Sequence, residues 1–115
     1  MVVEDEFLIA DDIATMLREA GAEVIGPAAS LPEGMRLASD TEKIDGAVLN
    51  IDLGEATVFP LADELLTRGV RIMFLTGYSE SHIPAGYAAI PCCAKPAPPG
   101  RVIEELTALM RPIAA

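Results

Sequence analysis

The stretch of sequence that decides the fold is Ile44–Asn50, which reads I-D-G-A-V-L-N. Most of its residues are apolar or small, as in a central strand of a parallel sheet that is covered on both faces. A polar residue, Asn50, closes the run. In open α/β sheets, ligands bind beyond the carboxyl ends of the strands, so Asn50 is a candidate site residue.

Apolar segments alternate with helical patterns on both sides of this stretch. Further strands are predicted at Met1–Glu4, Glu23–Gly26, Arg71–Leu75 and Ile90–Ala94. Helices are predicted at Glu6–Ala20, after Ser30, at Thr57–Arg68, at Glu80–Ala89 and from Pro98 or Pro99 onward. The alternation predicts βα units around a parallel sheet. We therefore expect an α/β flavodoxin-like (βα)5 three-layer sandwich with the strand order 2-1-3-4-5.

Several of these elements carry local signals. Ser30 and Glu33 form an S-x-x-E capping box that opens the second helix. Pro84 and Gly86 lie inside the fourth predicted helix and weaken it. Only three residues precede Glu4, whereas strands usually have about 5–6 residues. Either the first strand is truncated at its N-terminus or its start is assigned too late.

Bulk properties narrow the class of protein. The 115 residues suit one domain, spanning 1–115, and no apolar run approaches the ~18–20 residues that cross a membrane. The two cysteines are adjacent, which makes a poor structural disulfide and indicates a reduced, cytoplasmic chain. The net charge of −10 argues against binding to nucleic acid or to an anionic membrane surface. It is compatible with a basic protein partner or a cation.

Five polar residues lie at or just after the carboxyl ends of the predicted strands. Glu4 and Asp5 lie at the end of the first strand, Asn50 at the end of the third, Thr76 after the fourth and Lys95 after the fifth. Because the carboxyl ends of parallel strands lie at one edge of the sheet, we expect these side chains to converge.

Their order resembles the receiver domain of bacterial two-component response regulators. The resemblance rests on V-V-E-D-E at Val2–Glu6, on Asn50 and Thr76, and on the pair Lys95–Pro96, whose peptide bond is a cis candidate. The run F-L-T-G-Y at Phe74–Tyr78 also resembles the F-A-T-G-Y signature of a subgroup of stand-alone receivers. The resemblance covers essentially the whole chain and implies a part in phosphorelay signalling.

The resemblance also implies a role for each matching position. Glu4 and Asp5 match the acidic pair that binds Mg²⁺, a cation that prefers oxygen ligands. Asp52 matches the position whose backbone carbonyl completes the coordination. Thr76 matches the hydroxyl residue that binds the phosphoryl group, and Lys95 matches the lysine that pairs with the acceptor.

The sequence departs from the family at the acceptor itself. Asn50 stands where the family has the aspartate that takes the phosphoryl group, and a neutral amide is too weak a nucleophile for that step. The lost charge should weaken Mg²⁺ binding and leave Lys95 to pair with Asp5, Asp52 or solvent. Cys92 stands where an aromatic switch residue is often found.

We therefore expect a non-phosphorylatable pseudo-receiver and not an enzyme. It would bind a sensor histidine kinase, a histidine phosphotransfer protein or a second copy of itself. In the family, the first helix and the face formed by helix 4, strand 5 and helix 5 are the contact surfaces.

Three alternatives stay open. The first is a working receiver that uses Asp52, or a native Asp at position 50 if Asn50 is an engineered change. A two-residue shift moves a carboxylate by up to ~7 Å, far beyond the ~1 Å that catalysis tolerates. The second is a small-molecule or flavin binder on the same fold. The third, a hydrolase using paired acids, is disfavoured because Glu4 and Asp5 are consecutive and their side chains diverge.

Overall fold

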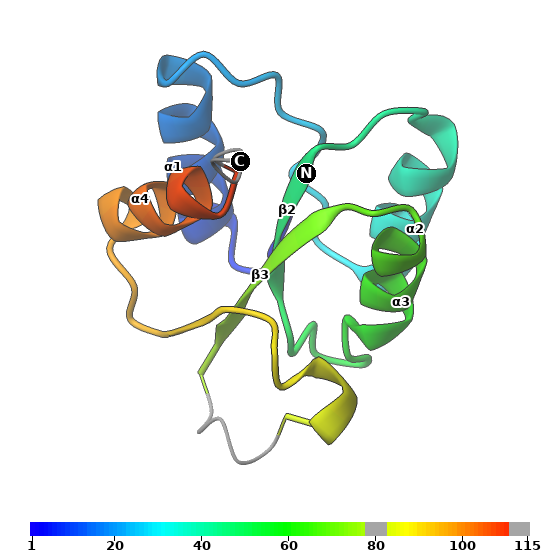
Figure 1. Ribbon diagram of the computed structural model, residues 1–115. Coiled ribbons are helices and arrows are strands. Elements are labelled where there is room, and N and C mark those ends of the chain that lie inside the picture. Colours follow the sequence, from blue (N-terminus) through cyan, green and yellow to red (C-terminus); the bar gives the residue numbers. More distant parts are fainter. Residues whose placement is uncertain (78–82, 111–115) are drawn as a thin grey trace, which may run out of the picture.

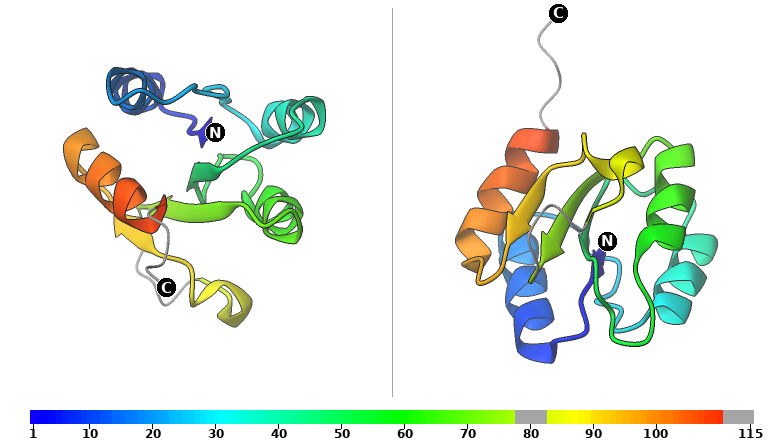
Figure 2. Two further views of the ribbon diagram at one scale, coloured as in Figure 1. Left: turned by 45° about the horizontal axis from the view of Figure 1, so that its top comes forward. Right: turned by 90° about the horizontal axis from the view of Figure 1, so that it is seen from below.

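The structure is a computed structural model that describes residues 1–77 and 83–110. A parallel sheet forms the middle layer, with α1 and α4 on one face and α2 and α3 on the other (Figures 1 and 2). The strands are β1 (Val2–Val3), β2 (Gly46–Asn50), β3 (Arg71–Thr76) and β4 (Cys92–Ala94). The α-helices are α1 (Phe7–Glu19), α2 (Leu31–Asp40), α3 (Phe59–Thr67) and α4 (Pro99–Met110), and η2 (Ala85–Tyr87) is a 3-10 turn.

The four strands pair in the order β1-β2-β3-β4, and every pairing is parallel. Their register aligns Val48 with Val2 on one side and with Met73 on the other. The expectation of a flavodoxin-like α/β fold with a parallel sheet is confirmed. Within the described part of the chain, no helix has the length and apolar character that a membrane span needs.

The strand predicted at Glu23–Gly26 is wrong. The segment runs beside β1, and the carbonyl of Ile25 accepts a hydrogen bond from the Val2 N–H at 3.1 Å, but none of its residues forms a strand. The only bridge to β1 in this part of the described chain is the isolated one between Val3 and Ala28. Gly26 has a φ of 99°, outside the strand region, and Pro27 has no N–H to donate to a ladder. The five-stranded order 2-1-3-4-5 is therefore not confirmed.

The helix predicted at Glu80–Ala89 is also wrong where it can be followed. Residues 80–82 lie outside the described residues, and 83–89 contain only the short turn η2. Pro84 precedes this turn and Gly86 lies inside it, so the composition that weakened the predicted helix explains its loss.

The strands divide their side chains between two apolar layers, because successive residues point to opposite faces. The layer beneath α2 and α3 includes Val3, Ala47, Leu49, Ile72, Phe74, Leu61 and Leu65. The layer beneath α1 and α4 includes Val2, Val48, Met73, Leu75, Ile13, Val102 and Leu106. Both layers fix the strands, and the strands in turn fix the positions of the polar residues at their carboxyl ends.

The capping box predicted for α2 is confirmed. Ser30 is the N-cap, and its Oγ accepts a hydrogen bond from the backbone N–H of Glu33 at 3.3 Å. The Glu33 carboxylate reaches back to the N–H of Ala29, also at 3.3 Å. The amide of Glu33 in the first turn and the amide of Ala29, just before the N-cap, thus gain partners that the helix itself does not supply.

Candidate functional site

Asn50 lies at the centre of the residues that converge at the carboxyl edge of the sheet. The residue is 4% exposed, and its Nδ2 lies 2.9 Å from Glu4 Oε2 and 2.9 Å from Asp5 Oδ1. The backbone carbonyl of Asp52 lies 2.7 Å from the same nitrogen. An amide nitrogen carries two hydrogens, so three acceptors share two N–H groups. Asn50 therefore joins the end of β1 to the loop after β2.

Lys95, just after β4, forms an ion pair with Glu4. Its Nζ lies 2.6 Å from Glu4 Oε1 and 3.3 Å from Glu6 Oε1. The expectation that Lys95 would turn to Asp5, Asp52 or solvent is wrong. Lys95 pairs with Glu4 because the Glu4 carboxylate is fully buried. A buried charge needs a partner of opposite charge close by, since water no longer stabilises it.

Burial and charge act in opposite directions on this pair. Burial raises the pKa of the Glu4 carboxyl above its ordinary value of 4.5, in spite of the nearby Lys95 ammonium. Burial lowers the pKa of Lys95, but the carboxylates of Glu4 and Glu6 outweigh it and raise that pKa above its ordinary value. The lysine is therefore held in its charged form.

Thr76 completes the group of polar strand ends. It is the last residue of β3, its side chain is buried, and its backbone carbonyl accepts a hydrogen bond from the Lys95 N–H at 2.8 Å. The peptide bond between Lys95 and Pro96 is cis, as the resemblance indicated. The structure thus places all the predicted strand-end residues in one region.

The carboxylate of Asp52 has a different role from its carbonyl. Its Oδ1 accepts a hydrogen bond from the N–H of Gly54 at 2.9 Å, which turns the side chain into the loop after β2. It is the backbone carbonyl of Asp52 that accepts the hydrogen bond from Asn50. This geometry favours the structural interpretation of the Asp52 side chain over its use as a phosphoacceptor.

The oxygens that a divalent cation would use are Glu4 Oε2, Asp5 Oδ1 and the Asp52 carbonyl, and all three accept hydrogen bonds from Asn50. Magnesium needs such oxygens at about 2.0–2.1 Å in near-octahedral geometry. Among the described residues, no three or more His, Cys, Asp or Glu side chains are arranged to hold a metal ion. While the Asn50 amide nitrogen donates to these three oxygens, the site does not fit Mg²⁺, because an N–H donor stands where the cation would bind.

An aromatic cluster that joins η2, α3 and β3 was not predicted from the sequence. Tyr87 of η2 stacks on Phe59 of α3 with ring centroids 4.4 Å apart, and its hydroxyl donates to Asp63 Oδ1 at 2.6 Å. Phe74 of β3 packs edge-on against both rings. These residues come from three separate elements, so no sequence spacing links them. Glu6 was also missed, although it is the third acid of the V-V-E-D-E run.

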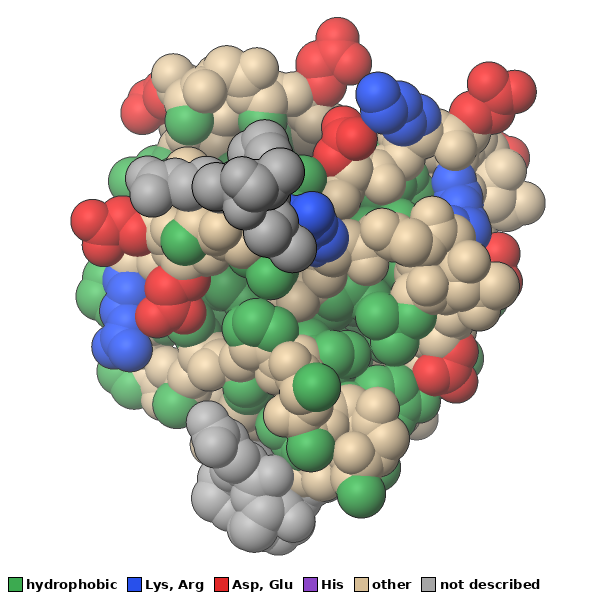
Figure 3. Space-filling view, viewed as in Figure 1, with side chains coloured by type: hydrophobic (Ala, Val, Ile, Leu, Met, Phe, Trp, Pro, Cys, Tyr) green, Lys and Arg blue, Asp and Glu red, His purple; other side chains and the backbone are tan. Residues whose placement is uncertain are grey.

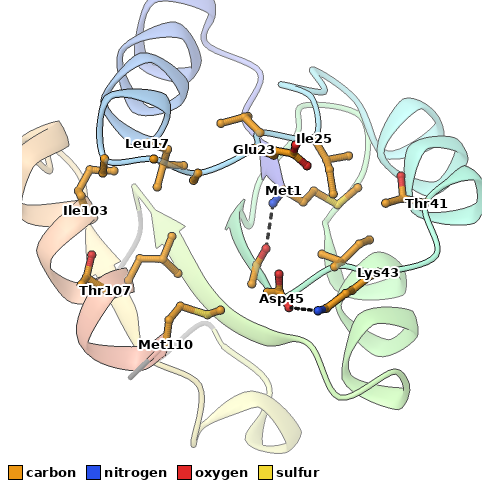
Figure 4. A pocket seen from close by; sticks show the side chains of 17 residues that line it. Met1, Leu17, Glu23, Ile25, Thr41, Lys43, Asp45, Ile103, Thr107 and Met110 are labelled. Atoms are coloured by element: carbon orange, nitrogen blue, oxygen red, sulfur yellow. Dashed lines mark hydrogen bonds and ion pairs between the residues drawn. The ribbon is translucent and has the colours of Figure 1, made fainter. Parts of the chain in front are cut away.

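A cavity of about 560 Å³ lies at the opposite end of the sheet, where the strands begin (Figure 4). Leu17 of α1 and Ile103 and Met110 of α4 line one side of it, and residues 43–46 line another. On the face of the molecule seen in Figure 3, apolar side chains gather near the centre and acidic ones towards the edge. None of the six predicted site residues lines the cavity. It therefore lends no support to a flavin site at the carboxyl edge.

Known proteins resemble this chain in both sequence and fold. The transcriptional regulatory protein PdtaR of Mycobacterium tuberculosis is 32% identical over 81 residues, which cover 70% of this chain and 39% of PdtaR. The phyllosphere-induced regulator PhyR of Methylorubrum extorquens is 32% identical over 82 residues, covering 70% of this chain and 31% of PhyR. The solution structure of SdrG from Sphingomonas melonis superposes with a TM-score of 0.79 at 27% identity, covering 96% of this chain and 93% of SdrG.

The chain is a response regulator receiver domain. No model of a known protein family matches it. The receiver domain described here spans only about a third of the length of its curated relatives. Those relatives are regulatory proteins by name, which agrees with a part in two-component signalling.

Proposed function

We propose that this domain is a pseudo-receiver, which takes part in phosphorelay signalling by binding a protein partner and takes no phosphoryl group at position 50. The observation that carries the proposal is Asn50 at the carboxyl end of β2, with its Nδ2 donating to Glu4, Asp5 and the Asp52 carbonyl. An amide is neutral and weakly nucleophilic, so it forms no stable acyl phosphate. The F-L-T-G-Y run further suggests membership of the F-A-T-G-Y subgroup.

The position of Lys95 supports the same proposal. Its ammonium is paired with Glu4 and Glu6, both of which belong to the segment around β1. In a working receiver, we would expect the lysine to pair with an acceptor carboxylate at position 50. Here the lysine compensates a buried carboxylate at position 4, a role that does not involve phosphate.

The start of α1 offers a surface for a partner. Phe7 and Leu8 are 79% and 76% exposed, and they follow directly after Glu6, which contacts Lys95. Exposed apolar side chains that lie close together mark interaction sites more often than isolated ones do. We propose that a sensor histidine kinase or a histidine phosphotransfer protein docks here in the cytoplasm, or alternatively a second copy of the chain.

Phosphoryl transfer tests the first half of the proposal. The wild-type chain and Asn50→Asp are each incubated with acetyl phosphate and Mg²⁺, and intact mass is measured at neutral pH. We expect a phosphoryl adduct on Asn50→Asp and none on the wild type. A Mg²⁺-dependent, base-labile adduct on the wild type, mapped to the loop containing Asp52, would show a working receiver instead.

Docking tests the second half. The affinity for a histidine phosphotransfer protein is measured by calorimetry for the wild type, for the double variant Phe7→Ala/Leu8→Ala and for Leu66→Ala. Leu66 is an exposed leucine on α3, away from the proposed surface, and serves as the control. We expect at least a tenfold loss for the double variant and little change for Leu66→Ala. Equal losses in both would refute α1 as the docking surface.

A further inference from the structure

We infer that the side-chain amide of Asn50 takes the place of the divalent cation in this receiver, so that the acidic site is complete without metal. The inference rests on the proposed assignment of Asn50 to the acceptor position, and it does not depend on which partner binds. The hydrogen bonds from Asn50 hold the acidic residues of the site together, whether or not the domain takes a phosphoryl group.

The geometry shows that amide and cation compete for the same atoms. Asn50 Nδ2 lies 2.7–2.9 Å from Glu4 Oε2, Asp5 Oδ1 and the Asp52 carbonyl. These three oxygens come from the end of β1 and from the loop after β2, which a cation would have to bridge. Because the nitrogen already stands among them, a cation can bind them only if the amide moves away.

Charge compensation is also complete around Glu4. Its Oε2 accepts from Asn50 and from the N–H of Glu6 at 3.2 Å, and its Oε1 lies 2.6 Å from Lys95 Nζ. Both oxygens of this buried carboxylate therefore have positively polarised partners, as a buried charge requires. A cation entering beside Glu4 would have to compete with an ammonium group that is already in contact.

The orientation of the amide is determined by its neighbours. If the amide were turned over, its Oδ1 would face the carboxylates of Glu4 and Asp5, and three acceptors would meet without a hydrogen between them. That arrangement is favourable only when a cation lies between the oxygens. Cation binding therefore requires this turn and the loss of the hydrogen bonds from Asn50, of which the two to carboxylate oxygens are the stronger.

The test asks whether Mg²⁺ can replace a deleted amide. Urea unfolding of the wild type and of Asn50→Ala is measured with EDTA and with millimolar Mg²⁺, with ionic strength matched by NaCl. We expect Asn50→Ala to be less stable in EDTA, because the three oxygens lose their donor, and to regain stability in Mg²⁺. The wild type should show the same midpoint in both solutions.

Two results would overturn the inference. One is a wild-type midpoint that rises with Mg²⁺ as much as that of the variant, and the other is an Asn50→Ala midpoint that does not respond to Mg²⁺. If Asn50→Ala does not fold, Asn50→Asp replaces it, and calorimetry should show Mg²⁺ affinity at least tenfold above that of the wild type; an equal affinity would refute the inference. These measurements involve no phosphoryl donor, so their outcome is independent of the phosphoryl-transfer test.

Discussion

At the scale of single residues, the ion pair between Lys95 and Glu4 places two opposite charges 2.6 Å apart, largely shielded from water. The Glu4 side chain is fully buried and that of Lys95 is 16% exposed. Removing one partner of a buried pair leaves the other charge without compensation. We expect Lys95→Met to lower the free energy of unfolding by about 3 kcal/mol at pH 7.

Lys43→Met provides the matched control for this prediction. Lys43 lies 4.0 Å from Asp45, and its side chain is 86% exposed, so its removal should change stability by less than about 0.5 kcal/mol. Urea unfolding of both variants measures the difference. Similar losses in the two variants would show that the buried pair has no special weight.

The pH dependence of the Lys95→Met variant follows from the pKa of Glu4. Burial raises this pKa above 4.5, so the folded chain holds the proton more tightly than the unfolded chain does. The free energy of unfolding must then fall as the pH rises from 4.5 through the higher pKa of Glu4 in the folded chain. The deficit of Lys95→Met should therefore be small well below pH 4.5, where Glu4 is protonated in both states, and full at pH 7. A deficit that does not change with pH would contradict this account.

At the scale of elements, η2 is attached to α3 through Tyr87. The ring of Tyr87 stacks on Phe59, and its hydroxyl donates to Asp63. We expect Tyr87→Phe, which keeps the stack, to cost about 0.5–1 kcal/mol. Tyr87→Ala should cost about 2 kcal/mol, because it also removes the aromatic packing. Unfolding in urea measures both losses, and equal losses would mean that the stack contributes nothing.

The elements also show which sequence signals suffice to predict structure. The capping box of Ser30 and Glu33 gave the correct start of α2, because its hydrogen bonds are local. The segment Glu23–Gly26 was predicted as a strand and forms none, since Gly26 has a positive φ. The prediction failed because the composition of the segment does not reveal this backbone conformation. The parallel sheet was predictable because apolar strands and amphipathic helices alternate several times along the chain. A single irregular segment has no repeated pattern from which its conformation could be predicted.

The site was predictable as a set of residues but not in its contacts. Strand ends brought Asn50 together with Glu4 and Asp5, as the topology requires. The donor role of the Asn50 amide depends on side-chain orientation, which a residue type does not specify. The pairing of Lys95 with Glu4 depends on relative burial, which only the packed structure determines.

At the scale of the whole molecule, the net charge of −10 should decide which macromolecules bind. Nucleic acid is attracted by clusters of Lys and Arg, and this chain has 8 such residues against 18 Asp and Glu. We expect no change in fluorescence anisotropy when a labelled DNA duplex or RNA hairpin is titrated with the receiver domain at physiological salt. Saturable binding that weakens as salt increases would refute this expectation.

The measurement that tests the central claim most directly is the side-chain NH₂ signal of Asn50 in a ¹H–¹⁵N NMR spectrum. Asn50 is the only asparagine in the chain and there is no glutamine, so its two amide hydrogens give the only such pair of signals. If the amide takes the place of the cation, both hydrogens exchange slowly with solvent, and millimolar Mg²⁺ leaves their shifts unchanged. Saturable movement of this pair with Mg²⁺, accompanied by fast exchange, would show that the amide turns to bind metal and would contradict the account.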